Sequence, residues 1–140
     1  MARLYIGIDC GTNTGVAVWH SGDRKFIAVE TMMIHQALEY VKELKRENEV
    51  KVYFEDARLR TWYGDNDPKK DRDKLQGAGS VKRDSAIWED FLLDNSIPFV
   101  AVKPAKGNTK WRADWFKRVT GWKGRTSEHS RDAAVLVYGR

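Results

Sequence analysis

The first third of the chain alternates short apolar runs with polar breaks and then changes to a helical period. Residues 4–8 and 16–19 are two apolar runs joined by the polar turn CGTNT, and SGD at 21–23 marks a hairpin into a third run at 24–31. In 32–48 the apolar residues recur every three or four positions, with Glu and Lys between them. These patterns predict three antiparallel strands followed by a helix with one apolar face.

The middle of the chain carries two more strand signals with a helix signal between them. VKVYFED at 50–56 and IPFVAV at 97–102 predict strands, and a helix is expected from about Ser80 to Asn95. The segment 57–77 has no sustained period, carries many charges and contains Pro68, so we expect a long loop there.

Two further helices are expected near the end of the sequence. The segment 109–121 places Trp111, Trp115 and Val119 four residues apart, as on one helix face. The segment 126–139 opens with a capping box in which Thr126 or Ser127 bonds back to the first helical turn. This closing helix is amphipathic at its start and almost wholly apolar by its end.

The order of these elements defines the fold class. A strand that follows a crossover helix lies parallel to an earlier strand, so we expect 50–56 to pair with 4–8. With 140 residues, 41% of them hydrophobic, the chain has the size and composition of one globular domain spanning 1–140. The sequence therefore predicts a single α/β domain built on a mixed sheet.

The cysteine count and the hydropathy indicate in which cellular compartment the protein is expected. Cys10 is the only cysteine, which excludes an intrachain disulfide and a cysteine-based zinc site and suits a reducing cytoplasm. No apolar run approaches the ~20 residues of a membrane-spanning helix, and the N-terminal apolar segment is too short for a signal peptide. We therefore expect a cytoplasmic protein without a membrane partner.

Basic residues are concentrated in the last third of the chain. The formal net charge is only +5, from 25 Lys and Arg against 20 Asp and Glu. From position 103 onward the acidic residues are Asp114, Glu128 and Asp132. The basic residues over the same stretch are Lys103, Lys106, Lys110, Arg112, Lys117, Arg118, Lys123, Arg125, Arg131 and Arg140. This distribution suggests a polyanionic partner, and a solvated basic surface is the alternative.

Four side chains form a candidate metal site. Asp9 and Glu55 end two strands that we expect to be parallel neighbours, so both carboxylates should project from the same end of the sheet. In the last helix His129 and Asp132 are three residues apart, which is about 60° of rotation and roughly 4.5 Å of rise, so both can reach one spot.

The mutual repulsion of these carboxylates argues for a cation. Three carboxylates about 6 Å apart repel by roughly 3 kcal/mol per pair at an effective dielectric constant near 20. The sum of about 8 kcal/mol rivals the whole stability of a typical domain. Mg²⁺ or Mn²⁺ would reverse that contribution, and the imidazole nitrogen favours Mn²⁺ slightly.

Each of the four residues also has a structural alternative. Asp9 precedes a glycine turn, and aspartates commonly form such turns. Glu55 would be the solvated end of a strand, His129 an exposed polar residue near a helix start, and Asp132 the partner of a nearby arginine. The hypothesis therefore depends on the four residues together.

Four segments together resemble the RuvC family of Holliday-junction resolvases, within the RNase H-like nuclease superfamily. YIGIDCGTNTGVAVW at 5–19 is similar to the family's opening strand and turn, and VYFEDAR at 52–58 is similar to its fourth strand. QGAG at 76–79 resembles the beginning of the central helix. EHSRDAAVLV at 128–137 resembles the closing helix, with its pattern of His or Asp, two residues, Asp and Ala. The motifs follow in the family's order over nearly the full chain.

The resemblance implies an RNase H-like fold, with a mixed five-stranded sheet and helices on both faces. It implies a homodimeric, metal-dependent endonuclease that resolves four-way DNA junctions by paired symmetric nicks, leaving 5′-phosphate and 3′-hydroxyl ends. Two Mg²⁺ or Mn²⁺ ions per site would be held by Asp9, bridging both, by Glu55, and by His129 with Asp132. His129 stands where some relatives carry aspartate, which should affect metal preference more than activity.

Further residues are candidates for contact with the phosphate backbone. The resemblance places a basic residue near the scissile phosphate, and either Lys106 or Lys110 would serve or would contact another phosphate. The DNA backbone would be able to approach Asp9 closely because the neighbouring residues are small, namely Gly11, Thr12, Asn13 and Gly15. The candidate DNA-binding residues are Arg58, Arg60, Trp62, Tyr63, Gln76 and Lys103.

Two features have open alternatives. Trp62 and Tyr63 would stack on bases opened at a branch point, or would instead anchor their loop to the body. The helix at 80–95 is rich in apolar residues, namely Val81, Ile87, Trp88, Phe91 and Leu92. These would form the dimer contact unless they are buried inside one chain.

Other functions are compatible with the same motifs. A nuclease acting on other branched DNA or on RNA–DNA hybrids would use the same ligands, because metal ligands fix the chemistry while loops choose the nucleic acid. A protein that binds branched DNA without cutting it is a second alternative. Sugar-kinase and actin-like ATPase domains share the opening Asp-x-Gly-Thr motif, but they need a second similar domain and further phosphate motifs, so we expect no nucleotide cofactor.

Overall fold

The computed structural model describes residues 3–59, 68–104 and 110–140, with the backbone alone for 68–78. The chain begins with β1 (Arg3–Asp9), β2 (Asn13–His20), β3 (Lys25–Met33), α1 (Ile34–Glu47) and β4 (Glu49–Glu55). It continues through the short 3-10 helix η1 (Ala57–Leu59), α2 (Pro68–Asp94), β5 (Phe99–Val102), α3 (Ala113–Thr120) and α4 (Glu128–Val135). The α/β class expected from the sequence is confirmed.

The strands form one five-stranded mixed sheet in the order β3-β2-β1-β4-β5. β1 and β2 are antiparallel, as are β2 and β3, which confirms the three opening antiparallel strands. β4 returns after α1 to lie parallel to β1, and β5 lies parallel to β4. The expected pairing of 50–56 with 4–8 is therefore confirmed, and the carboxyl ends of β1 and β4 meet at one edge of the sheet.

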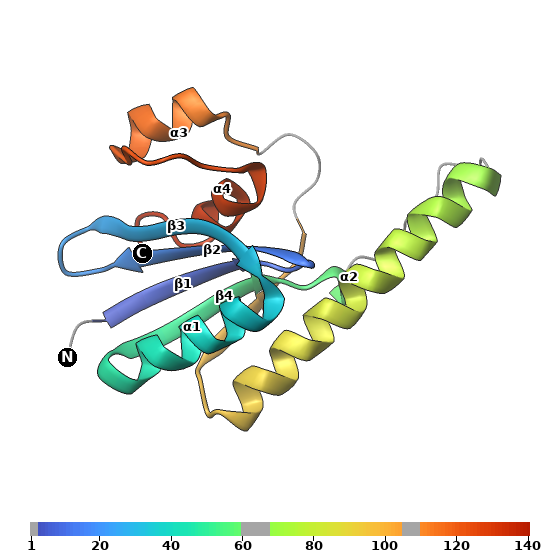
Figure 1. The fold of residues 1–140 in the computed structure, drawn as a ribbon, viewed down its shortest axis with the longest axis horizontal. Helices are drawn as coiled ribbons and strands as arrows, with labels where there is room; N and C mark the ends of the chain where they lie inside the picture. Colours follow the sequence, from blue (N-terminus) through green and yellow to red (C-terminus); the bar gives the residue numbers. More distant parts are fainter. Residues whose placement is uncertain (1–2, 60–67, 105–109) are drawn as a thin grey trace.

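Helices cover both faces of the sheet, with α1 and α2 on one side and α3 and α4 on the other (Figure 1). Alternate residues of each strand face alternate layers because strand side chains have a period of two. Ile6 and Ile8 pack in the core beneath α1 and α2, whereas Ala17 and Trp19 pack beneath α3 and α4. Both faces of the central strands are buried, which explains why their sequences are continuous apolar runs.

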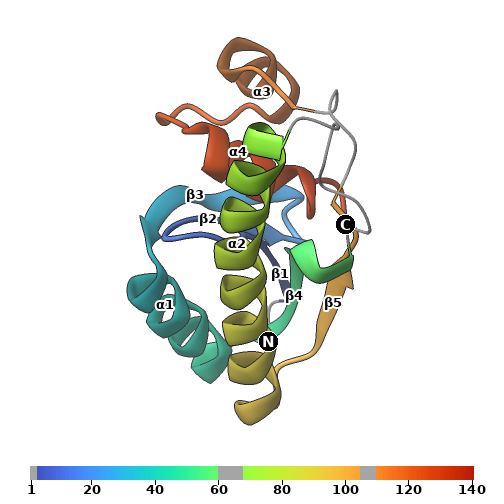
Figure 2. The same cartoon turned by 90° about the vertical axis from the view of Figure 1, so that its right-hand side faces the viewer.

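α2 is longer than the sequence suggested, and the long loop expected over 57–77 is wrong in part. The helix already begins at Pro68 and spans 27 residues. Proline suits the first turn of a helix because its missing N–H has no acceptor to lose there. The N-terminal half of α2 extends beyond the sheet (Figures 1 and 2), so it has no core to face and no apolar period to announce it.

The C-terminal half of α2 buries its large apolar residues within the chain. Trp88 and Leu92 are fully buried in the core under the sheet. These two residues are therefore unavailable for the dimer contact, and the alternative of burial inside one chain is correct for them. Val81 and Ile87 stay partly exposed. No helix in the described part of the chain combines the length and the apolarity needed to cross a membrane.

α3 is shorter than the helix expected over 109–121, and the expected apolar face is wrong. The helix begins after its N-cap residue Arg112, so Trp111 lies before the helix. Phe116 is fully buried and Trp115 is 49% exposed. The buried face is therefore centred on Phe116, which contacts the rings of Trp111 and Phe26.

Candidate active site

All four candidate ligands line one cavity at the carboxyl ends of β1 and β4. Asp9 is the last residue of β1 and Glu55 the last of β4, and the preceding residues Ile8 and Phe54 are paired across the parallel ladder. His129 and Asp132 come from the first turns of α4. The cavity has a volume of about 660 Å³, and its lining also includes Cys10, Lys103, Lys110 and Glu128. The sequence prediction that these four side chains meet is supported by this shared cavity.

Two glycines allow α4 to lie directly on the sheet. A Cβ atom on Gly7 would lie 2.0 Å from the carbonyl oxygen of Ala133, and one on Gly15 would lie 2.0 Å from that of His129. Gly15 is also buried. The expectation that Gly15 makes room for DNA is therefore wrong, because the room is taken by the backbone of α4. Gly11 has no such contact and is partly exposed.

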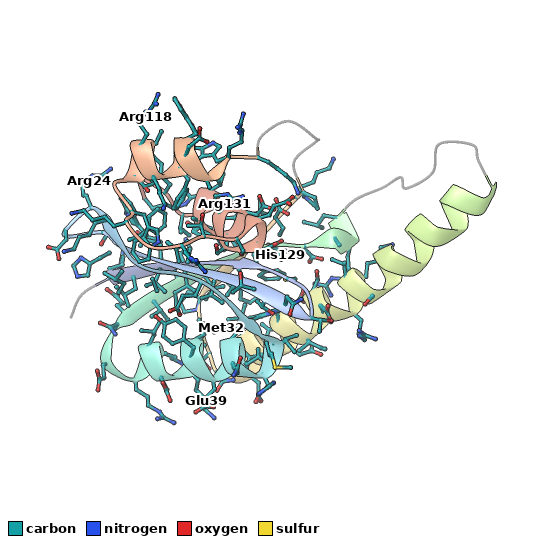
Figure 3. The ribbon with its side chains drawn as sticks, turned by 45° about the horizontal axis from the view of Figure 1, so that its top comes forward. Arg24, Met32, Glu39, Arg118, His129 and Arg131 are labelled. Carbon is teal, nitrogen blue, oxygen red and sulfur yellow. The ribbon has the colours of Figure 1, made fainter. Side chains whose placement is uncertain are left out.

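The start of α4 is held in place by its cap. The Ser127 side chain accepts a hydrogen bond from the Ser130 backbone N–H at 3.0 Å, and the Ser130 hydroxyl reaches back to the Ser127 backbone. Thr31 of β3 hydrogen-bonds to the Ser127 hydroxyl. The capping box expected from the sequence is confirmed with Ser127 as N-cap. It fixes the turn that presents His129, which is visible at the start of α4 in Figure 3.

Asp9 is a largely enclosed acid that contacts His129. Its Oδ2 atom lies 2.9 Å from Nδ1 of His129, and its side chain is 18% exposed. Burial raises the pKa of the Asp9 carboxyl; the hydrogen bond with His129 opposes this rise, and the charge of Asp132 adds to it. The site therefore disfavours a bare negative charge at Asp9, and a nearby positive charge would stabilise it.

Lys110 lies among the acids of the site. Its Nζ atom forms an ion pair with Glu128 and lies 3.6 Å from Oδ2 of Asp132. These contacts raise the pKa of Lys110, and the same pair lowers the pKa of Glu128. Of the two candidate lysines, Lys110 reaches the cluster and Lys106 lies outside the described residues. Among the described residues, Asp132 thus has Lys110, rather than an arginine, as its ion-pair partner.

Glu128 is a member of the cluster that sequence reasoning missed. It precedes His129 in the first turn of α4 and lines the cavity. An acidic residue in the first turn of a helix is also favoured by the helix dipole, so the residue type alone does not indicate a place in the cavity. Its ion pair with Lys110 spans 18 residues, which no local pattern announces.

Cys10 lines the cavity but is not set up as a nucleophile. Burial raises the pKa of the Cys10 thiol to about 12, and the neighbouring acids, with Asp9 first, act in the same direction. The thiolate is the reactive form of cysteine, so this side chain stays protonated near neutral pH. The chemistry of the cavity therefore rests on its carboxylates, imidazole and lysines.

The donor set fits a hard divalent cation. Three carboxylates and one imidazole around one cavity are the ligands that Mg²⁺ and Mn²⁺ take, with oxygen predominating. Among the side chains that the structure describes, those of 3–59, 79–104 and 110–140, however, no three of His, Cys, Asp or Glu stand in a metal-binding arrangement. Asp9 is instead paired with His129, and Asp132 with Lys110. The residues fit the cation by identity and location, and their side chains would have to turn to bind it.

The structure describes only some of the candidate DNA-binding residues. Lys103 is exposed and lines the cavity. Arg58 forms ion pairs with Asp56 and Glu89. Arg60, Trp62 and Tyr63 lie outside the described residues, and Gln76 lies in α2 where the backbone alone is described. Their contacts with DNA stay predictions.

Comparisons with known proteins add no relative. No protein-family model matches the sequence, and no curated protein matches it at a significant level. The function must therefore be argued from the cavity and its residues.

Proposed function

We propose that the protein is a RuvC-like, metal-dependent endonuclease that resolves four-way DNA junctions by paired symmetric nicks. The observation that carries the proposal is the shared cavity of Asp9, Glu55, His129 and Asp132 at the carboxyl ends of two parallel strands. Ligands bind at this end of open α/β sheets. The order of the motifs along the chain and the RNase H-like arrangement that we infer for the sheet agree with this activity.

Asp9, Glu55, His129 and Asp132 would hold two Mg²⁺ or Mn²⁺ ions. The bound ions would supply an activated water and stabilise the leaving 3′ oxygen, so that the products carry 5′-phosphate and 3′-hydroxyl ends. The positive charge of the ions would offset the burial that disfavours the isolated carboxylate of Asp9. The neutral imidazole of His129 would contribute a nitrogen ligand.

Two lysines on the cavity wall would bind the scissile phosphate. Lys103 and Lys110 line the same cavity as the acids. The Lys110 ammonium lies close to Glu128 and Asp132 and would turn to a phosphate oxygen when the strand binds. A charged hydrogen bond from an ammonium to a phosphate oxygen is stronger than one between neutral groups, so this exchange of partners is physically reasonable.

A basic segment that leaves the cavity and returns to it would hold the DNA backbone. It leaves at Lys110, runs through α3 and returns at Glu128. Its exposed basic residues are Arg112, Lys117, Arg118, Lys123 and Arg125. Arg118 points outward from α3 (Figure 3), and the half-exposed Trp115 lies on the same helix. Such side chains bind phosphates without reading sequence.

A homodimer would supply the second nick. A four-way junction presents two equivalent strands, so paired symmetric cleavage needs two active sites related by a twofold axis. Light scattering with and without junction DNA tests this directly. A monomer mass in both samples would contradict the dimer and leave the nuclease proposal standing.

The function is tested by cleavage of an end-labelled four-way junction in Mg²⁺ and in Mn²⁺. The substrates for comparison are linear duplex of the same sequence and an RNA–DNA hybrid. Wild type is compared with Asp9→Asn, which keeps the shape of the side chain and removes its charge. We expect symmetric nicks on the junction, and their loss in the variant.

Each other outcome identifies a different function. Junction binding without cleavage in either metal would refute the endonuclease and favour a protein that only binds branched DNA. Cleavage of the hybrid, or equal cleavage of duplex, would keep the nuclease and refute the junction as its substrate. Cleavage that survives Asp9→Asn would refute the assignment of the site.

A further inference from the structure

A chain of ion pairs joins the end of β4 to α2 immediately behind Glu55. Asp56 is buried, and its carboxylate accepts two hydrogen bonds from the Arg58 guanidinium, from Nε to Oδ1 at 2.8 Å and from Nη2 to Oδ2 at 2.7 Å. The Arg58 backbone N–H also donates to Oδ1, at 3.0 Å. The same Nη2 atom contacts Glu89 of α2. We call these three residues the Asp56–Arg58–Glu89 clamp.

Backbone hydrogen bonds support the clamp on both sides. The Asp56 N–H donates to the carbonyl of Val102 on β5 at 2.8 Å, which continues the sheet one residue past Glu55. The Ala57 N–H donates to the hydroxyl of Ser85 on α2 at 3.3 Å, and Ser85 is fully buried. The two residues that follow Glu55 are thus tied to the neighbouring strand and to the helix.

We propose that Arg58 is a positioning residue, which holds Glu55 at the cation site and connects its position to α2. The inference rests on the proposed function, because Glu55 is assigned there as a ligand. The planar guanidinium can bind a carboxylate through two parallel hydrogen bonds, and the ammonium of lysine cannot. Asp56 is buried and follows Glu55 directly, so the orientation of its peptide limits where the Glu55 side chain begins.

This role differs from the DNA contact that the sequence suggested for Arg58. A phosphate contact depends on positive charge, which lysine keeps. A positioning contact depends on the two parallel hydrogen bonds, which lysine loses while keeping the charge. The variants Arg58→Lys and Arg58→Gln therefore separate the two roles. Arg58→Lys is the decisive one, because it keeps the positive charge and loses the two parallel hydrogen bonds.

The experiment measures Mn²⁺ binding by electron paramagnetic resonance of the free ion, without DNA. Loss of a residue that orients a metal ligand typically weakens metal affinity by about 10–100-fold. We expect both Arg58→Lys and Arg58→Gln to weaken Mn²⁺ binding by about tenfold. The matched control is Arg3→Gln, because Arg3 pairs with Glu49 across the same two strands at the far end of the sheet. We expect it to bind Mn²⁺ like wild type.

Junction binding in EDTA provides the second arm. If Arg58 contacted a phosphate, Arg58→Gln would reduce the slope of log affinity against log salt by about 1, and Arg58→Lys would restore it. We expect no change in either variant. Mn²⁺ binding within twofold of wild type in both variants, in a protein that melts like wild type, would overturn the positioning role.

A metal-independent measurement keeps the inference separate from the proposed function. If wild type bound no Mn²⁺, the proposed function would fail, and amide hydrogen exchange would decide on the clamp. We expect exchange at Ala57 and at position 58 to become at least about tenfold faster in Arg58→Lys, because both amides donate within the clamp region. Unchanged exchange would overturn the clamp.

The connection to α2 has its own variant, which also serves if Arg58→Gln fails to fold. Glu89→Gln removes the charge of the helix side of the clamp and leaves the pair between Arg58 and the buried Asp56 intact; the Glu89 side chain is 35% exposed. We expect about threefold weaker Mn²⁺ binding, because only one of the two carboxylates that contact Arg58 loses its charge. Affinity equal to that of wild type would refute the connection to α2.

Discussion

The contact between Gly15 and α4 gives the most demanding prediction, because one added methyl group would meet backbone. A Cβ atom at position 15 would lie 2.0 Å from the His129 carbonyl oxygen, 2.4 Å from its carbonyl carbon and 3.1 Å from Cβ of Asp9. Neither carbonyl atom belongs to a flexible side chain that could turn away. Gly15→Ala must therefore push the start of α4 away from the sheet.

The size of the displacement follows from this geometry. Real Cβ atoms essentially never approach other atoms closer than 3.0 Å, so the His129 carbonyl must retreat by at least about 1 Å. Overpacking of this kind costs about 1–3 kcal/mol. A domain of this size loses about 4 °C in melting temperature per kcal/mol. A 1 Å misplacement of groups in an active site lowers activity by about 10²-fold, so the proposed cleavage should fall by about this factor as His129 and Asp132 move with the helix.

The assay combines thermal melting with cleavage of the four-way junction. Gly79→Ala is the matched control, since a Cβ atom at Gly79 meets nothing within 4 Å and the residue lies inside α2. An alanine in a helix interior is about 0.5–1 kcal/mol more favourable than glycine, so this variant should melt higher and cleave normally. If Gly15→Ala melted within 1 °C of wild type and cleaved at the same rate, the close contact of α4 with β2 would be refuted.

Three further predictions follow from the charges in the cavity. Asp9→Asn should raise the melting temperature at pH 7 and abolish cleavage. Burial raises the pKa of the Asp9 carboxyl in the folded state, so the wild type loses stability as the pH rises from about 3.8 to this folded-state pKa. The gain in melting temperature of the variant over wild type should therefore vanish toward pH 4. A constant gain across this range would contradict the burial argument. Lys110→Gln should lower junction affinity and reduce the salt slope by about 1; an unchanged slope in filter binding would exclude a phosphate contact. Cys10 should react with iodoacetamide about a thousandfold more slowly in the native protein than in urea at pH 8, because its pKa is raised from 9.0 to about 12; equal rates by mass spectrometry would show that the thiol is accessible and ionised.

The central strands could be predicted from the sequence because burial on both faces requires a continuous run of apolar residues, which is a local pattern. β1 and β4 are buried on both faces, so each is a short apolar run that ends in a carboxylate, at Asp9 and Glu55. The crossover rule then placed the two ends together. The cap at Ser127 was equally local, since its partner Ser130 is three residues away.

The N-terminal half of α2 and the start and buried face of α3 correspond to no such local pattern in the sequence. Residues 68–79 extend past the sheet, and an element without a core beneath it needs no apolar period (Figure 1). In α3, two aromatic residues are adjacent. The spacing in the sequence predicted that Trp115 is buried, whereas in the structure Phe116 is buried and Trp115 is exposed. Spacing cannot decide such a pair, because the choice depends on where the helix begins.

Contacts between distant residues were also beyond the sequence. Part of the Arg58 contact is local, since Asp56 is two residues away, but its contact with α2 is made to Glu89, 31 residues away. Gly15 was expected to admit the DNA backbone, because nothing near it in the sequence shows that it must avoid the carbonyl of His129. In both cases the residue type indicated that the position is constrained, but the contacting residue could be identified only in the folded structure.

The separation of the site along the chain has a consequence for biosynthesis. Asp9 and His129 are 120 residues apart, and they meet only when α4 lies on β1 and β2. The first strands leave the ribosome long before α4 does, and N-terminal segments can fold during synthesis. A nascent chain therefore carries half of the cluster until α4 has been made. A message truncated before α4 would yield a sheet that lacks His129 and Asp132, so incomplete products should lack the proposed cleavage activity.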